Sequence, residues 1–215
     1  MIISVESNIG AGGKHFLRYL SQRGWNVRYQ PTEWKDVNGT NILALFRSNP
    51  RKYAFMFQAH DMEMQMVEPA DSVLITERSM GSCHEIFSQQ LYNSGALNQV
   101  EYDVLSAIYE RKQKNVDGVF YLRSSPYTCL NRIERRNRAG DVYLNLDYLK
   151  DLHEIHEDLF WQKHSVRGPI SQVLCFRMRW GGGLIHCPAA FREAEAKLEL
   201  LISMLKDEES SEAES

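Results

Sequence analysis

A glycine-rich segment directly after an apolar run constrains the fold of this chain more than any other feature. Residues 1–5 (MIISV) have the apolar, β-branched character of a buried strand, and residues 6–13 (ESNIGAGG) carry three glycines. Residues 14–22 then have the apolar spacing of a helix. A strand, a tight glycine loop and a helix, in this order, are typical of α/β proteins that bind phosphate at a helix amino terminus.

The loop is close to the phosphate-binding pattern G-x-x-x-x-G-K-[ST], in which backbone amides and the lysine hold phosphates and the hydroxyl holds Mg²⁺. Ser7 stands at the first glycine. Read without a gap, Gly13 takes the lysine position and Lys14 the hydroxyl position; with one inserted glycine, Lys14 is the lysine and His15 replaces the hydroxyl. The residues expected to bind the nucleotide are Asn8, Ile9, Gly10, Ala11, Gly12, Gly13 and Lys14.

Strands and helices alternate along the rest of the chain, which predicts an α/β fold with a parallel sheet flanked by helices on both faces. Further strands are predicted at 25–29, 72–76, 118–122 and 172–176. Helices are predicted at 14–22, 40–47, 50–68, 81–92, 98–114, 126–138 and 146–163. A last amphipathic helix should bury Phe191, Ala194, Leu198, Leu201, Ile202 and Leu205.

Composition narrows the class of protein. With 215 residues, 43% of them hydrophobic, the chain can bury one full core, expected over residues 1–206, and residues 207–215 form an acidic tail that we expect to be disordered. A net charge of −3 argues against binding a nucleic acid polymer. No apolar run approaches the ~18 residues of a membrane span, and no targeting pattern is present, so we expect an intracellular, cytoplasmic protein without a membrane partner.

Polar residues follow two of the predicted strands. Residues 30–34 (QPTEW) come after one strand, and Glu77 and Arg78 come directly after another. The carboxyl ends of parallel strands meet at one edge of a sheet, where ligands bind, so these residues should lie beside the glycine loop. A carboxylate and a guanidinium would then emerge at this edge beside the phosphates, although a structural ion pair is a fair alternative.

The order of these motifs is similar to that of the deoxynucleoside kinase family, P-loop enzymes that phosphorylate the 5′-hydroxyl of deoxynucleosides. The resemblance runs from residue 1 to about residue 161. It rests on the loop at 8–12, the segment 30–34 with 38–39, the pair 57–58, and the segments 77–79, 121–126 and 148–158.

The resemblance implies a P-loop nucleoside kinase fold, ATP as phosphate donor, Mg²⁺ and a role in nucleotide salvage. It implies that Glu77 lies near Mg²⁺ and that Arg78 lies near the reacting 5′-oxygen. It also implies an arginine-rich lid near residues 132–145, whose arginines would close over the donor phosphates. The lid arginines assigned to the donor are Arg132, Arg136 and Arg138.

For the deoxynucleoside itself, the resemblance assigns a pocket. The Gln58 amide suits pairing with a nucleobase edge, while Phe57, Trp34 and Phe87 would form apolar walls. Asp141 would reach the sugar 3′-hydroxyl. Because relatives often pair through helices, we also expect a homodimer formed by the apolar faces of helices 40–68 and 81–114.

Several family positions are altered. Gln30 stands where the family has a glutamate that takes the proton from the 5′-hydroxyl, and an amide has no useful basicity. Glu33, three residues on, is a candidate substitute. Arg47 replaces a tyrosine that contacts the sugar.

Three functions are therefore open. The first is a deoxynucleoside kinase, and the second is a pseudokinase that binds nucleosides without transferring phosphate, because Gly13, His15 and Gln30 disable transfer. The third is a nucleoside monophosphate kinase, which Gln58 and Glu77-Arg78 fit less well than an uncharged nucleoside acceptor.

Overall fold

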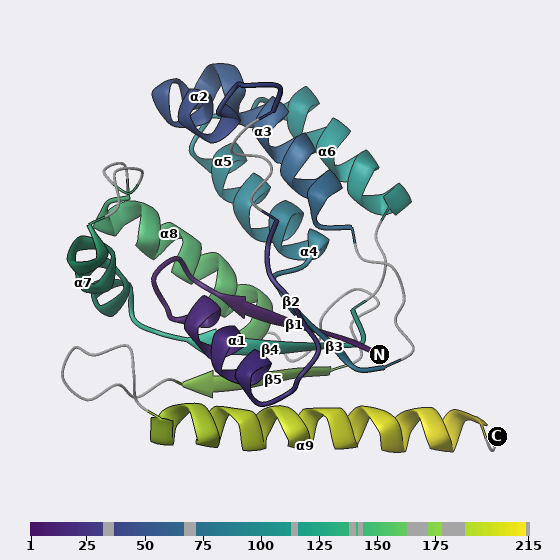
Figure 1. Ribbon diagram of the computed structural model, residues 1–215. Helices are drawn as coiled ribbons and strands as arrows, with labels where there is room; N and C mark the ends of the chain where they lie inside the picture. Colours follow the sequence, from purple (N-terminus) through teal and green to yellow (C-terminus); the bar gives the residue numbers. More distant parts are fainter. Residues whose placement is uncertain are drawn as a thin grey trace.

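A five-stranded, all-parallel sheet forms the centre of the molecule (Figure 1). The computed structural model describes residues 1–31, 37–66, 72–112, 116–137, 141, 144–162, 172–177 and 188–213. The strands lie in the order β2-β3-β1-β4-β5. They are β1 (Ile2–Ser7), β2 (Val27–Arg28), β3 (Leu74–Glu77), β4 (Gly118–Arg123) and β5 (Gln172–Arg177). The predicted parallel α/β fold is confirmed, and the glycine loop follows the central strand.

The helices lie close to the ranges predicted for them. They are α1 (Gly13–Gln22), α2 (Ile42–Ser48), α3 (Pro50–Met64), α4 (Met80–Ser82), η2 (Cys83–Ser88), α5 (Gln89–Asn93), α6 (Gln99–Lys112), α7 (Pro126–Arg136), α8 (Leu146–His156), η4 (Glu157–Gln162) and α9 (Pro188–Ala213). The side chains of Asn49, Ser125 and Asn145 accept hydrogen bonds from backbone amides three residues on, which defines where α3, α7 and α8 begin.

Alternation along β1 directs its side chains to two different helical layers. Ile3 and Val5 pack against α1 and α9 on one face of the sheet. Ile2, on the other face, belongs to a cluster formed with η2, α8 and η4. Both faces of the sheet are thus covered by helices, as predicted for a buried parallel sheet.

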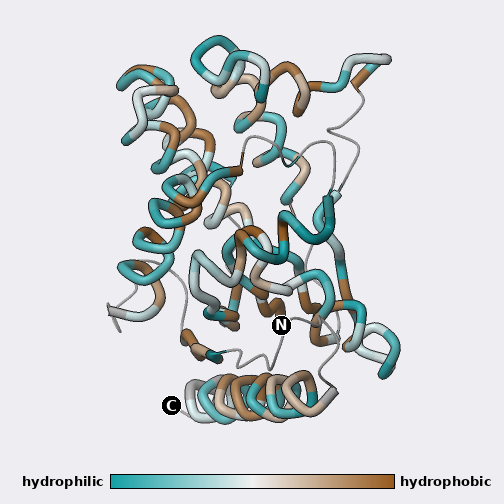
Figure 2. Tube along the Cα trace, turned by 90° about the vertical axis from the view of Figure 1, so that its left-hand side faces the viewer, coloured by the Kyte–Doolittle hydropathy of each residue, from teal (hydrophilic) through white to brown (hydrophobic). Residues whose placement is uncertain are grey.

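Helix α9 lies along one face of the sheet, and apolar and polar residues alternate along it (Figures 1 and 2). Its predicted core residues are all buried. They are Phe191, Ala194, Leu198, Leu201, Ile202 and Leu205. The helix runs on to Ala213, so residues 207–213, which we expect to be disordered from their composition, are helical in the structure.

Further helices lie on the face of the sheet opposite α9, where they pack against η2 (Figure 1). Helices α3 and α6 pack with η2 around a separate apolar cluster that includes Met62, Cys83 and Leu105. No helix among the residues described is long and apolar enough to cross a membrane.

Candidate active site

One large pocket opens at the carboxyl edge of the sheet, between the glycine loop and helices α2 and α3. Its volume is about 890 Å³. Most of the predicted site residues line it: Asn8, Ile9, Gly10, Gly12, Gly13, Lys14, Gln30, Phe57, Gln58, Glu77, Arg78, Phe87, Arg132, Arg136 and Asp141. Glu33, Trp34 and Arg138 lie outside the described residues.

The backbone of the glycine loop favours the reading of the motif without a gap. Gly12 has a φ of 108°, which favours glycine, and α1 begins at Gly13. Gly13 is therefore the first helical residue, where the motif without a gap has its lysine. A Cβ on Gly13 would lie 2.6 Å from the Oγ of Ser7, so the serine hydroxyl occupies the space beside it. The Nζ of Lys14 lies 6.0 Å from the centre of the Tyr29 ring.

The loop is fixed by contacts within itself and with helices α7 and α8. The Asn8 amide donates to the backbone oxygen of Leu149 at 2.8 Å, and its Oδ1 accepts from the Ile9 amide at 2.7 Å. Ala11 does not line the pocket but is buried with Cys129 and other residues of α7 and α8. These contacts hold the loop backbone in a defined conformation, as an anion site built from backbone amides requires.

Arg132 binds the loop itself. Its Nη1 donates to the backbone oxygens of Gly10 at 3.3 Å and Ala11 at 3.0 Å, and burial lowers the pKa of the guanidinium. Arg136, one turn further along α7, pairs with Asp141 at 2.6 Å. The structure thus joins two residues that the sequence analysis assigns separately, Arg136 to the donor phosphates and Asp141 to the sugar.

Glu77, Arg78 and Gln30 meet on the other side of the loop. The Glu77 carboxylate accepts from the Gln30 backbone amide at 3.0 Å, and the Arg78 Nη1 lies 3.4 Å from the Gln30 Oε1. Arg78 has a left-handed φ of 66° and its guanidinium lies 4.3 Å from the centre of the Phe87 ring. A non-glycine residue in this conformation stores strain, which is common at functional sites.

Phe57 and Gln58 follow each other on α3. Phe57 stacks on Phe46 of α2, with ring centres 4.7 Å apart. Gln58 is buried, and its Oε1 accepts a long hydrogen bond of 3.4 Å from Ser88. Since Gln58, Phe57 and Phe87 line one pocket, a planar ligand edge can meet the amide while its faces meet the aromatic rings.

Two buried carboxyl groups in and near the pocket were not predicted from the sequence. Asp61 of α3, three residues after Gln58, lines the pocket and accepts from the Gln30 Nε2 at 3.2 Å. Glu6 lies under the loop, where Ser79 and Ser4 donate to its Oε1; burial outweighs these bonds and raises its pKa. Asp61 could have been found from its spacing, because residues three apart on a helix lie on the same face and Gln58 was already assigned to the pocket.

The residues present fit a nucleoside polyphosphate. The glycine loop, Lys14 and Arg136 all line the pocket, and their amides and cations suit phosphate oxygens. Mg²⁺ is usually held by one or two carboxylates together with phosphates, and Glu77 is a carboxylate in this position. Within the described ranges, no group of three or more metal-ligating side chains gathers.

A parallel sheet, a glycine loop at its central strand and a polar pocket at the sheet edge define an α/β protein that binds phosphorylated ligands. Residues 3–188 match the sequence model of the deoxynucleoside kinase family. The chain therefore belongs to the deoxynucleoside kinase family, whose members are enzymes that transfer phosphate, with ATP as donor, to a nucleoside.

Individual relatives support this assignment. The chain is 29% identical over 184 residues to a probable deoxycytidine kinase of Fowlpox virus, covering 80% of this chain and 77% of that protein. It is 32% identical over 168 residues to the mitochondrial thymidine kinase 2 of Homo sapiens, covering 73% of this chain and 63% of that protein. It is 29% identical over 197 residues to the deoxycytidine kinase of Homo sapiens, with 75% of both chains covered.

Proposed function

We propose that this chain transfers the γ-phosphoryl group of ATP to the 5′-hydroxyl of a deoxynucleoside, in nucleotide salvage. The observation that carries the proposal is the position of Arg78. Its guanidinium is fixed between the Phe87 ring and the Gln30 amide, at the junction of the phosphate loop and the aromatic pocket. A fixed cation at this junction stabilises charge that develops on a transferring phosphoryl group.

In this proposal the acceptor occupies the part of the pocket lined by Phe57, Gln58 and Phe87. The Gln58 amide pairs with the nucleobase edge, and the rings of Phe57 and Phe87 contact its faces. Asp141 and Arg47, which line the same pocket, flank the sugar. Relatives named as deoxycytidine and thymidine kinases support a deoxynucleoside acceptor.

ATP supplies the phosphoryl group, with Mg²⁺ neutralising phosphate charge. The loop amides from Asn8 to Gly13 bind the phosphates, and Lys14, which follows the loop, lines the same pocket. Arg136 is released from Asp141 when it binds phosphate oxygens. The Glu77 carboxylate would hold the Mg²⁺, and its hydrogen bond with the Gln30 backbone amide fixes the segment after β2.

The test is transfer of radiolabelled phosphate from Mg-ATP to each of the four deoxynucleosides, with calorimetric titration of the same nucleosides in parallel. Saturable binding with transfer to at least one deoxynucleoside is the expected result. The absence of both transfer and binding contradicts the proposal.

A second candidate is a pseudokinase that binds nucleosides without phosphorylating them. It is favoured by Gly13 at the start of α1, where the phosphate-loop motif has its lysine, and by the amide of Gln30. Binding without transfer in the same experiment would establish it.

We also propose a homodimer, since Val100 and Val104 of α6 are exposed apolar residues, and a monomeric mass in light scattering would contradict it.

A further inference from the structure

This inference rests on the proposed function and concerns Asp61. The Asp61 side chain lines the acceptor pocket although the residue is 5% exposed. Its Oδ1 accepts from the Gln30 Nε2 at 3.2 Å, and its Oδ2 accepts from the Cys83 thiol at 3.3 Å. A buried carboxylate costs folding free energy unless it is well compensated, and one placed in a pocket is a candidate for function.

The Gln30 amide lies between this carboxylate and Arg78. Gln30 donates to Asp61 through its nitrogen, while its oxygen lies 3.4 Å from the Arg78 Nη1. The amide therefore connects the guanidinium beside the reacting oxygen to the buried carboxylate. An amide at this position can orient a hydroxyl but cannot accept its proton.

Other carboxylates of the pocket are committed to other contacts. Asp141 pairs with Arg136, and the Glu77 Oε2 accepts from the backbone amide of Gln30. Asp61 is held by a neutral thiol and a neutral amide, neither of which has to be displaced from a salt bridge before the carboxylate takes a proton.

We propose that Asp61 is the general base of this chain, replacing the carboxylate that Gln30 does not carry. Asp61 accepts the proton of the acceptor hydroxyl, directly or through one water, as the hydroxyl oxygen bonds to the γ-phosphorus of ATP. The bond from that phosphorus to the bridging oxygen breaks, ADP leaves with the electron pair, and the proton passes from Asp61 to water.

The surroundings of Asp61 suit this role. Burial raises the pKa of its carboxyl, and the thiol of Cys83, the charge of Arg78, the Gln30 amide and His60 counteract part of this rise. A carboxylate with a raised pKa is a stronger base, provided it remains ionised at the working pH. These four groups are the polar and charged neighbours that set its titration among the residues described.

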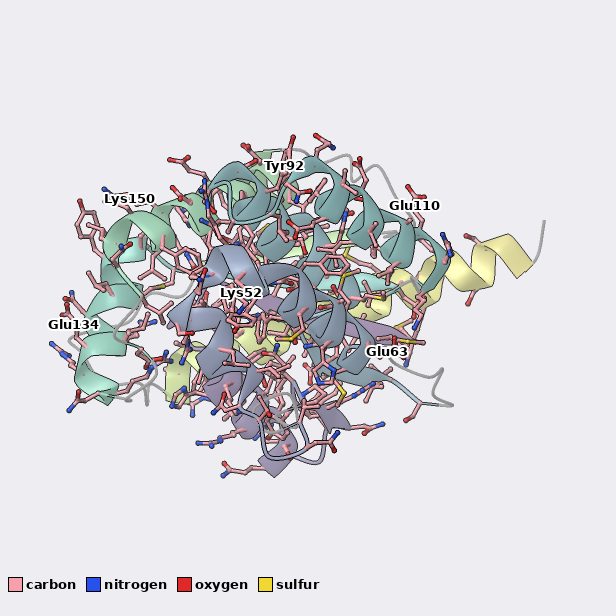
Figure 3. The ribbon with its side chains drawn as sticks, turned by 90° about the horizontal axis from the view of Figure 1, so that it is seen from above. Lys52, Glu63, Tyr92, Glu110, Glu134 and Lys150 are labelled. Atoms are coloured by element: carbon pink, nitrogen blue, oxygen red, sulfur yellow. The ribbon has the colours of Figure 1, made fainter. Side chains whose placement is uncertain are left out.

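The experiment compares Asp61→Asn, Gln30→Glu and the double variant with the wild type in phosphate transfer, with calorimetric deoxynucleoside binding as a second readout. The matched control is Glu63→Gln, an exposed carboxylate on the same helix that pairs with Lys112 (Figure 3). We expect Asp61→Asn to lower kcat at least about 100-fold with nucleoside Kd changed less than about threefold. Gln30→Glu should restore most of kcat in the double variant.

In a pH–rate profile, the wild-type kcat should also fall at low pH, because Asp61 becomes protonated. The residual kcat of Asp61→Asn should not show this fall. Retained kcat in Asp61→Asn, or a changed preference among nucleobases with kcat unchanged, would overturn the inference and make Asp61 a specificity residue. Inactivity that Gln30→Glu does not relieve would overturn it too, as would loss of kcat in Glu33→Gln. Absence of transfer by the wild type would instead remove the proposed function, which separates the two failures.

Discussion

The Ser7 hydroxyl fills the space that a side chain at Gly13 would need, because a Cβ at position 13 would lie 2.6 Å from the Ser7 Oγ. The two departures from the phosphate-loop motif are therefore not independent: the hydroxyl at the first position occupies the space beside the residue that replaces the lysine. A lysine can return to position 13 without strain only if the hydroxyl moves or is removed.

The paired variant Ser7→Gly with Gly13→Lys should strengthen ATP binding by about ten-fold or more, since a charge-assisted bond to phosphate contributes roughly 1.5–3 kcal/mol. Gly13→Lys alone should gain less, because its Cβ meets the serine hydroxyl. Calorimetric titration with a non-hydrolysable ATP analogue measures both. Equal gains in the single and double variants would show that the serine hydroxyl simply rotates away.

Arg78→Lys should lower kcat about 10²–10³-fold, the range seen when one transition-state donor is removed. Lysine keeps the charge but loses the planar group that stacks on Phe87 and reaches Gln30. Steady-state kinetics with the preferred deoxynucleoside measures the effect. A change in KM alone would assign Arg78 to ground-state binding instead.

The Arg136–Asp141 pair predicts non-additive kinetics. Each residue contacts the other at 2.6 Å, so removal of either changes the position of its partner. In a double-mutant cycle of Arg136→Ala and Asp141→Ala, we expect kcat/KM changes that depart from additivity by about 0.5–3 kcal/mol. Additive changes would mean that the pair does not hold either side chain for ligand binding.

Glu195 of α9 predicts an acid-sensitive contact. Tyr19 and Trp25 donate to its carboxylate at 2.8 and 2.9 Å, and Arg23 does so at 2.7 Å. Burial opposes ionisation of Glu195, but these bonds outweigh it and lower its pKa. Its stabilisation is therefore present above the unfolded pKa and is lost as pH falls through the lower folded pKa.

Thermal unfolding should show this as a steeper loss of Tm below about pH 4.5 in the wild type than in Glu195→Gln. At neutral pH, Glu195→Ala should cost about 1–3 kcal/mol, because donors at the contact between α1 and α9 lose their acceptor. The control is Glu193→Gln, an exposed carboxylate on the same helix. Parallel pH profiles of Glu195→Gln and the wild type would contradict the prediction.

The order of strands and helices was predictable because short apolar runs alternate along the sequence with segments whose apolar residues have helical spacing. Runs such as 1–5 and 118–122 indicated buried strands, and the spacing of Phe191, Leu198 and Leu205 indicated one buried helical face. Helix ends were predicted less well. Helix α3 ends at Met64, four residues before the predicted end, and α9 continues through the acidic segment expected to be disordered.

The site was predictable where residues follow strands directly, as Glu77 and Arg78 do. Contacts set by tertiary packing were not. Asp61 reaches Gln30 from a different element, and Arg132 turns to the carbonyls of Gly10 and Ala11. No local spacing encodes these pairs, because their members are separated by 31 and by more than 120 residues.

The sheet order also has a consequence for synthesis on the ribosome. Strand β1 is translated before the other four strands, yet it lies between β3 and β4 in the sheet. The helix that follows it, α1, buries Phe16, Leu17 and Leu20 partly against α9. The first residues of the described chain to emerge are thus among the last to find all their neighbours. A nascent chain that pauses before residue 188 would leave this apolar surface uncovered, where a chaperone would be expected to bind.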